Sequence, residues 1–319
     1  MKKINLLAEC AGASRIGISA HIRPDGDAVG SCMALYHYLR KGVPEAQVRV
    51  FLEPPSEVFR ELTGQGVVEH SFPGEPPFDV FFALDTAKER LGGAEKYFDE
   101  AAKRINIDHH ISNSLGCGDV NVVEPEASST AEVLYEQLDQ ELLDEEIAKA
   151  LYIGVIHDSG VFQYSNTSPR TMEIGADLIR YGFDFSRLIE ETFYQKSYMQ
   201  SQLLGRALLD STRYLEDRCI VSSLSLDILE YYGAKPSDLE GIVNQLRNVK
   251  GVDCAVFLYE TEQLEYKASL RSNEKVDVAK VAAVFGGGGH VRAAGCSVQG
   301  HPSEVADRLL AEIGKQLCR

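Results

Sequence analysis

Residues 104–113 read RINIDHHISN. Isoleucine alternates with polar residues up to Ile107, which is typical of a short strand, and Asp108, His109 and His110 follow at once. Each of these three side chains is costly to bury without a partner. A polar turn with two incidental histidines is the simpler interpretation of this stretch. The rest of the chain has to show whether these residues belong to a functional site instead.

The composition is typical of a soluble globular protein with about two domains. The chain has 319 residues, of which 44% are hydrophobic and 25% are charged, so it is long enough to bury substantial cores. No apolar run approaches the roughly 18 residues of a membrane helix. The N-terminal MKKINLLAECAGA predicts a first helix and not a signal peptide, because Glu9 interrupts its apolar run. We therefore expect no membrane association.

The net charge limits which ligands the protein is expected to bind, and the cysteines indicate the cellular compartment in which it is expected. The formal net charge is −16, whereas a protein that grips long nucleic acid needs basic patches. We therefore expect no long double-stranded nucleic acid as a partner, and an anion that is either short or met by bound cations. The seven cysteines are scattered, odd in number and without a CxxC pair, which predicts a reducing, cytoplasmic location.

The first part of the chain alternates predicted strands with predicted helices. Apolar runs predict strands at 15–20, 47–52, 80–84 and 104–107. A helix follows the first strand, from Asp27, which could cap it, to Gly42. Strands that are apolar on both faces and alternate with helices predict an α/β fold with a parallel sheet covered on both sides.

Three further helices are predicted before residue 182. Ser129 to Glu132 form a capping box whose helix is expected to run to about Leu142. Asp144 opens a second helix that ends near His157. Ser168-Pro169 opens a third, with Gly182 past its end. A mostly helical stretch without a strand is expected from about 184 to 214.

The last third of the chain has a different pattern. Strands are predicted at 219–225, 252–259 and 264–270, and helices near 236–248, 277–284 and 303–316. The short turn between the last two strands predicts a hairpin, and hence a smaller α/β domain with a mixed sheet. The predicted organisation is an N-terminal domain over 1–185, a helical connector over 186–214 and a C-terminal domain over 215–319.

Acidic and imidazole side chains gather where the N-terminal elements end. They are His21, Asp25 and Asp27 after the first strand, Asp85 after the third, Asp108, His109 and His110 after the fourth, and His157 and Asp158 after a helix. The carboxyl ends of parallel strands share one edge of a sheet, where ligands bind. Each fragment alone could be a polar turn or a helix cap, but together they favour one site.

So many carboxylates would repel one another unless cations hold them ionised. Four aspartates and two histidines are too many ligands for one tetrahedral zinc, and suit two ions that share a bridging carboxylate. Mixed carboxylate and imidazole ligands favour manganese or iron, with magnesium or cobalt as substitutes. Two such ions about 3.5–4 Å apart recur in phosphatases and nucleases.

A glycine-rich stretch, FGGGGHVRAAGCSV, occupies residues 285–298. Glycines let backbone N–H groups approach an anion closely, although a flexible turn between helix and strand is the simpler interpretation. From Lys267 to Arg292 five basic residues stand against two acids. A local excess of positive charge in an acidic chain favours a site for a phosphate or for the end of a short nucleotide.

These fragments, in this order, resemble the DHH phosphoesterase family. HIRPDGDAVGS, ALDTA, IDHH and HDSGVF are similar to its four metal-binding motifs, and FGGGGHVRAAG to the signature of its associated C-terminal domain. The resemblance covers nearly the whole chain, and the two-domain layout is most similar to the nanoRNase and pAp-phosphatase branch. It departs at His157, where relatives often have a non-titrating residue, and at Ser159, where threonine is common; the role of His157 stays open.

The resemblance implies a site with two Mn²⁺ ions, for which Mg²⁺ or Co²⁺ could substitute. His21, Asp25 and Asp85 would hold one ion, and Asp27, Asp85, His109 and Asp158 the other. His110 would face the scissile phosphate and Asp108 would orient a histidine. Arg271, Gly287, Gly288, Gly289 and His290 would bind the substrate.

The predicted function is a two-metal phosphoesterase for short nucleotides. Its substrates would be oligoribonucleotides of a few residues, linear dinucleotides or 3′-phosphoadenosine 5′-phosphate (pAp). The alternatives are a cyclic-dinucleotide phosphodiesterase, a single-strand exonuclease or an inorganic pyrophosphatase of the same family, and a non-catalytic nucleotide sensor. A homodimer, the native metal and the polarity of attack stay open.

Overall fold

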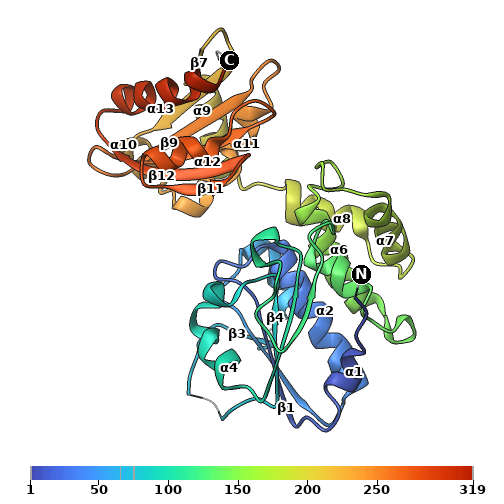
Figure 1. Ribbon diagram of the computed structural model, residues 1–319. Helices are drawn as coiled ribbons and strands as arrows, with labels where there is room; N and C mark the ends of the chain where they lie inside the picture. Colours follow the sequence, from blue (N-terminus) through green and yellow to red (C-terminus); the bar gives the residue numbers. More distant parts are fainter. Residues whose placement is uncertain (1, 65, 75, 318–319) are drawn as a thin grey trace. The chain divides into compact units, whose positions relative to one another are not determined.

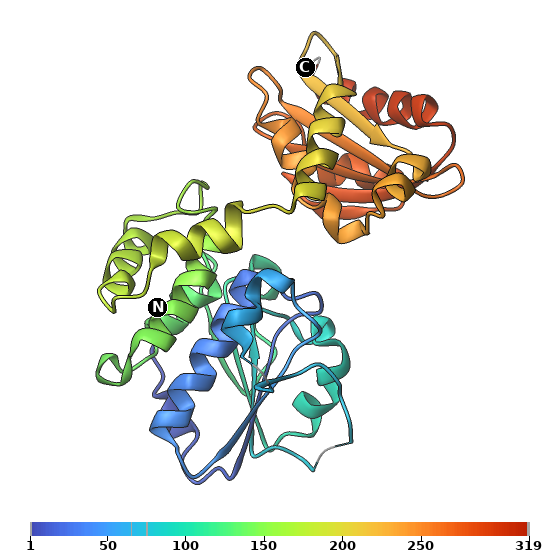
Figure 2. The ribbon, with the colours of Figure 1, turned by 180° about the vertical axis from the view of Figure 1, so that it is seen from behind.

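The computed structural model describes residues 2–64, 66–74 and 76–317. It divides into two compact units, Met1–Gln195 and Lys196–Arg319, which Figures 1 and 2 show from opposite sides. Each unit is an α/β structure around its own sheet, so the predicted fold class is confirmed. Within the described ranges no helix is both long and apolar enough to cross a membrane.

The first unit is built on a parallel sheet of six strands. Their order is β3-β2-β1-β4-β5-β6, and every neighbouring pair is parallel. The strands are β1 (Arg15–Ser19), β2 (Gln47–Phe51), β3 (Val68–Glu69), β4 (Val80–Leu84), β5 (Lys103–Asp108) and β6 (Val120–Val123). The strand order reverses between β1 and β4, which is where open α/β sheets bind ligands.

Helices cover both faces of this sheet, as its apolar strands predict. The helices are α1 (Leu6–Glu9), α2 (Gly26–Gly42), α3 (Arg60–Thr63), α4 (Glu95–Glu100), α5 (Thr130–Tyr135), α6 (Glu145–Asp158), α7 (Pro169–Ile179) and α8 (Phe185–Ile189). The larger core lies between the sheet and the layer of α2, α5 and α6. A phenylalanine-rich core fills the opposite face, under α4.

The second unit contains a mixed six-stranded sheet with the order β11-β12-β10-β9-β8-β7. Its strands are β7 (Thr212–Tyr214), β8 (Cys219–Leu224), β9 (Cys254–Glu262), β10 (Glu265–Ser272), β11 (Gly288–His290) and β12 (Ala293–Gln299). Only the β8–β9 pair is parallel. The helices are α9 (Tyr198–Leu209), α10 (Leu226–Tyr232), α11 (Ile242–Arg247), α12 (Val278–Val284) and α13 (Pro302–Leu317).

Several sequence predictions about single elements are wrong. The helix expected to reach Leu142 ends at Tyr135, because Asp139 adopts an extended conformation and caps a separate short turn. The cap of α2 is Asp25, and Asp27 lies inside the first turn. The stretch 184–214 does contain a strand, β7, whose three residues are all exposed and so leave no apolar pattern.

Candidate active site

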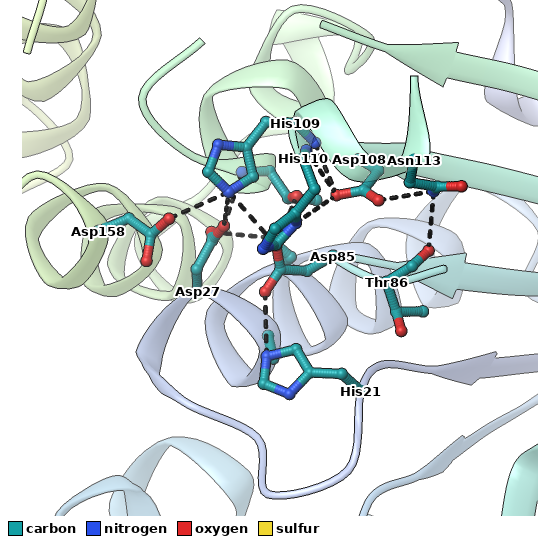
Figure 3. A network of polar contacts seen from close by, with 12 residues as sticks. His21, Asp27, Asp85, Thr86, Asp108, His109, His110, Asn113 and Asp158 are labelled. Atoms are coloured by element: carbon teal, nitrogen blue, oxygen red, sulfur yellow. Dashed lines mark hydrogen bonds and ion pairs between the residues drawn. The ribbon is translucent and has the colours of Figure 1, made fainter. Parts of the chain in front are cut away.

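The side chains predicted to share one edge of the sheet do lie together there (Figure 3). His21 follows β1, Asp85 follows β4, and His109 follows β5. Because β1, β4 and β5 are parallel neighbours, their carboxyl ends bring these residues side by side although the sequence separates them widely.

Two helices bring the remaining acids to the same place. Asp25 caps α2 by accepting hydrogen bonds from the backbone N–H groups of Asp27 and Ala28, both at 3.1 Å. Asp158 is the last residue of α6. The helix thus ends one residue later than the sequence predicted, and Asp158 belongs to the helix and not to the loop that follows it. The helices α2 and α6 pack closely because Gly30 faces the backbone of α6, where an added Cβ would lie 2.5 Å from the Ala150 carbonyl oxygen.

Three groups of side chains place their ligand atoms within 4.8 Å of one another. They are His21 with Asp25 and Asp85, Asp27 with His109 and Asp158, and Asp85 with His109 and His110. The structure therefore brings together all six residues predicted as metal ligands, and His110 with them.

Asp85 belongs to two of these groups and turns a different oxygen to each. Its Oδ2 lies 3.3 Å from His21 Nε2, and its Oδ1 lies 3.6 Å from His109 Nε2. The residue is 2% exposed and has a φ of 55°, a left-handed conformation that aspartate tolerates better than most residues. One carboxylate can thus serve two neighbouring cations.

His21 and His109 both turn Nδ1 towards a backbone carbonyl oxygen and Nε2 towards the acids. The Nδ1 atom of His21 lies 2.8 Å from the carbonyl oxygen of Ile22, and that of His109 lies 3.3 Å from that of Ala127. With the Nδ1 proton directed at the carbonyl oxygen, Nε2 is the nitrogen that would bind a cation once its own proton has been displaced. His109 Nε2 is buried and makes no hydrogen bond of regular geometry among the described residues, although Asp158 Oδ2 lies 3.1 Å away. A buried, unpartnered imidazole nitrogen among carboxylates fits a bound metal ion.

The electrostatics of this cluster also point to bound cations. Burial raises the pKa of Asp27 well above its usual range, and the charges of Asp85 and Asp158 raise it further. Burial lowers the pKa of His21, but hydrogen bonds with Asp25 and Asp85 outweigh it and raise the pKa to about 10. The cluster therefore holds protons tightly, and divalent cations could replace those protons.

His110 is held by Asp108 with its second nitrogen left available. Asp108 Oδ1 accepts hydrogen bonds from the backbone N–H groups of His109, at 2.7 Å, and His110, at 3.1 Å, and lies 2.8 Å from His110 Nδ1. The hydrogen bond with Asp108 is the main cause that raises the pKa of His110. The His110 side chain is 27% exposed, so its Nε2 can reach a substrate.

A buried amide network that the sequence analysis missed supports Asp108. Asn113 donates from Nδ2 to Asp108 Oδ2 at 2.7 Å and to Asn106 Oδ1 at 2.9 Å. Asn106 in turn donates to the carbonyl oxygen of Thr86 at 3.0 Å. The available signal was Asn106 itself, a polar residue between two isoleucines of the strand, all three of which are buried.

His157 lies outside the ligand groups, and its ring packs against Gly26. Its Nε2 lies 3.1 Å from Thr192 Oγ1. The Thr192 hydroxyl donates its hydrogen to the carbonyl oxygen of Leu188 at 2.8 Å, so His157 is the donor to Thr192. His157 thus connects the end of α6 with the π-helical turn at Glu190–Tyr194.

In the second unit, Arg271 and His290 lie in one row across three strands. Arg271 pairs with Ala293 in β10 and β12, and Ala293 pairs with His290 in β11. Directly paired residues share a face of the sheet, so the two side chains flank the small Ala293 at a separation of roughly 10 Å between backbones.

The predicted glycines form the hairpin that creates this row. Gly288 and Gly289 belong to β11, which is a strand and not the flexible turn that the simpler interpretation expected. A Cβ on Gly287 would overlap the Gly295 carbonyl oxygen, and one on Gly289 would lie 2.6 Å from Ala294 Cα. The glycines therefore allow β11 and β12 to approach closely and leave backbone groups exposed.

Comparison with known proteins agrees with this architecture. The model described as "DHH family, N-terminal domain" matches residues 15–155, and that of the "DHHA1 domain" matches residues 216–317. The chain therefore belongs to the DHH family, in the branch that carries a C-terminal DHHA1 domain.

Individual relatives are similar over the whole chain. The "bifunctional oligoribonuclease and PAP phosphatase NrnA" of Thermus thermophilus is 32% identical, over 100% of this chain and 95% of its own length. The protein of the same name from Bacillus subtilis is 27% identical, over 99% of both chains. A solved structure of an exopolyphosphatase-related protein from Bacteroides fragilis superimposes with a TM-score of 0.86, at 26% identity, over 95% of this chain and 93% of that one.

Proposed function

We propose that this protein is a hydrolase that uses two divalent cations to degrade short nucleotides. The observation that carries the proposal is Asp85, whose two oxygens face two separate groups of ligands. Similarity over the whole chain to proteins named oligoribonuclease and PAP phosphatase supports oligoribonucleotides of a few residues, linear dinucleotides and pAp as substrates.

The ligand set suits two Mn²⁺ ions, with Mg²⁺ or Co²⁺ as substitutes. His21, Asp25 and Asp85 would hold one ion, and Asp27, Asp85, His109 and Asp158 the other. When bound, the cations supply Lewis-acid activation of water and stabilise negative charge on the phosphate.

The chain's own residues supply orientation and a proton. Asp108 fixes the His110 ring through Nδ1, so that Nε2 can donate a proton to the leaving oxygen or a hydrogen bond to the phosphate. In the C-terminal unit, Arg271 and His290 would bind the terminal phosphate, while Gly287, Gly288 and Gly289 would offer backbone N–H groups.

A substrate panel tests the proposal directly. The purified protein with Mn²⁺ is incubated with pAp, linear pGpG and pApA, RNA 5-mers, a cyclic dinucleotide and a long single strand. We expect mononucleotide or phosphate to be released from the short linear substrates, and none in the presence of chelator. Turnover of the cyclic or the long substrate alone would favour the other phosphoesterases of the family. Binding without any turnover would indicate a nucleotide sensor.

We further infer a cytoplasmic enzyme that acts without a membrane or long double-stranded nucleic acid. The free thiols at Cys10, Cys32, Cys117, Cys219, Cys254 and Cys296 support a reducing compartment. A homodimer is compatible with this function, and sedimentation of the pure protein tests it.

A further inference from the structure

The start of α5 meets the candidate metal site although the sequence suggested only a helix cap there. Thr130 is fully buried and is the first residue of α5. Its backbone N–H donates to Asp27 Oδ2 at 2.6 Å, and its hydroxyl donates to Asp85 Oδ1 at 3.0 Å. One residue thus holds two of the proposed ligand carboxylates through two different groups.

The two contacts can be separated chemically. Asp27 keeps further partners if the Thr130 hydroxyl is removed, because the backbone N–H of Ala131 donates to its Oδ1 at 2.9 Å and the Ser31 hydroxyl at 3.3 Å. The Thr130 hydroxyl is the donor to the Oδ1 atom of Asp85, which faces His109. The other oxygen, Oδ2, faces His21 and does not bond to Thr130.

The segment that carries Thr130 is held rigidly on its far side. The Ser129 hydroxyl accepts a hydrogen bond from the Glu132 backbone N–H at 3.1 Å. The buried Glu132 carboxylate accepts from the Ser128 hydroxyl at 2.8 Å and from the Thr171 hydroxyl at 2.7 Å. These hydrogen bonds hold the segment in place, so the Thr130 hydroxyl is placed to orient Asp85.

We propose that Thr130 is a positioning residue whose hydroxyl orients Asp85, so that Oδ1 serves the cation held by Asp27, His109 and Asp158. The inference rests on the proposed two-cation function. Loss of an outer hydrogen-bond partner of a metal ligand typically weakens metal affinity about 10- to 100-fold. Because only Oδ1 is affected, the loss should fall on one of the two ions.

The test is a Mn²⁺ titration of the full chain, in which the electron paramagnetic resonance signal reports free Mn²⁺. We expect the wild-type protein to bind two ions. Thr130→Val should bind one ion with unchanged affinity and the other about 10- to 100-fold more weakly, and Thr130→Ser should restore the wild-type titration. The Mn²⁺ concentration for half-maximal turnover of a dinucleotide should shift in parallel, with kcat at saturating Mn²⁺ nearly unchanged.

Thr63→Val is the matched control, because Thr63 is also buried and its hydroxyl donates to the carbonyl oxygen of Arg60, which belongs to none of the ligand groups. It should lower the melting temperature without changing Mn²⁺ binding. Equal Mn²⁺ binding by Thr130→Val and the wild type, failure of serine to restore binding, or the same loss in Thr63→Val would each overturn the inference. Thr130→Ala replaces valine if that variant does not fold. A wild-type protein that binds no Mn²⁺ would instead overturn the proposed function.

Discussion

At the scale of single residues, Asp85 and His110 have separable roles. Asp85 is buried between two ligand groups, whereas His110 lies at the exposed side of the cluster and is fixed by Asp108. Removing the Asp85 carboxylate should weaken cation binding at both positions, and removing the His110 imidazole should leave cation binding intact. This difference makes the two roles distinguishable by experiment.

Asp85→Asn keeps the size of the side chain and its left-handed backbone but removes the charge that two cations would share. We expect a loss of turnover larger than the roughly 10- to 100-fold cost of losing an outer partner of a ligand. The Mn²⁺ stoichiometry, measured by equilibrium dialysis, should fall below two ions for each chain. Retained stoichiometry would show that Asp85 does not bridge.

His110→Asn should lower kcat for a dinucleotide by roughly 100- to 10,000-fold, the usual range for loss of a general acid. Mn²⁺ binding should not change. The defect should nearly vanish with a p-nitrophenyl nucleotide ester, whose leaving group needs no proton. An equal defect on both substrates would assign His110 to stabilisation of charge on the phosphate.

The sequence predicted which side chains gather at this edge of the sheet, but it did not predict the residues that support them. His21, Asp85 and His109 could be predicted because each follows an apolar run at the same edge of a parallel sheet. Thr130 could not be predicted, because its sequence signal is only that of a helix cap. Its contacts with Asp27 and Asp85 depend on the packing of segments about 45 and 103 residues apart.

At the scale of elements, the approach of α2 to α6 sets the distance between Asp27 and Asp158. Gly30→Ala would place a Cβ against the backbone of α6, where no side-chain rotation can relieve it. We expect destabilisation of about 1–3 kcal/mol, measured by urea unfolding, together with weaker Mn²⁺ binding. Gly205→Ala is the control, because a Cβ there meets no atom within 4 Å, and it should be neutral or stabilising.

The second element-scale prediction concerns the row of residues across β10, β12 and β11 that begins with Arg271. Arg271→Ala should raise KM for pAp or a dinucleotide while kcat stays nearly constant, if Arg271 contacts the substrate equally in the ground and transition states. Lys315→Ala, an exposed charge on α13, is the control and should change neither constant. A fall in kcat instead would show that Arg271 acts mainly in the transition state.

The sequence predicted the strands with long apolar runs, but it missed β3, β6, β7, β11 and β12. The apolar runs of β1, β4 and β9 identify them from the sequence alone. β11 consists of two glycines and a histidine, and its pairing with β12 depends on close backbone approach, which no side-chain periodicity reports.

At the scale of the whole molecule, stability should depend on pH and cations through the first unit. In chelator, the melting temperature of this unit should fall as the pH rises from 6.5 to about 10. The pKa values of His21 and His109 are about 10 in the folded protein, against 6.5 for a free imidazole. The folded state thus holds more protons than the unfolded state in this window, so stability present below pH 6.5 is lost as the pH rises.

Divalent cations should remove most of this dependence. Cations displace the same protons from the folded state, so above pH 6.5 the folded and unfolded states hold nearly equal numbers of protons, and the melting temperature of the first unit in saturating Mn²⁺ should change little as the pH rises. Calorimetry across the window, with and without Mn²⁺, measures both slopes. A melting temperature that does not change with pH in chelator would contradict the prediction that the folded cluster binds extra protons.

The division into domains is harder to predict than their fold. The stretch predicted as one connector, 186–214, is divided by the structure: α8 belongs to the first unit and α9 to the second. Helical periodicity continues through both helices, and the boundary near residue 195 depends on which core each helix packs against. A single sequence does not contain that information.

The left-handed backbone of Asp85 has a consequence for the evolution of this site. Few residues other than glycine accept that conformation readily, and aspartate, asparagine and histidine are the most tolerant. Of these, only aspartate has two equivalent charged oxygens to turn in two directions. Glutamate is ordinarily the mildest replacement for aspartate. It has the same charge, but it does not readily adopt the left-handed backbone conformation. No substitution of Asp85 is therefore expected to be neutral. A lineage that loses this aspartate is expected to lose the two-ion chemistry in a single step.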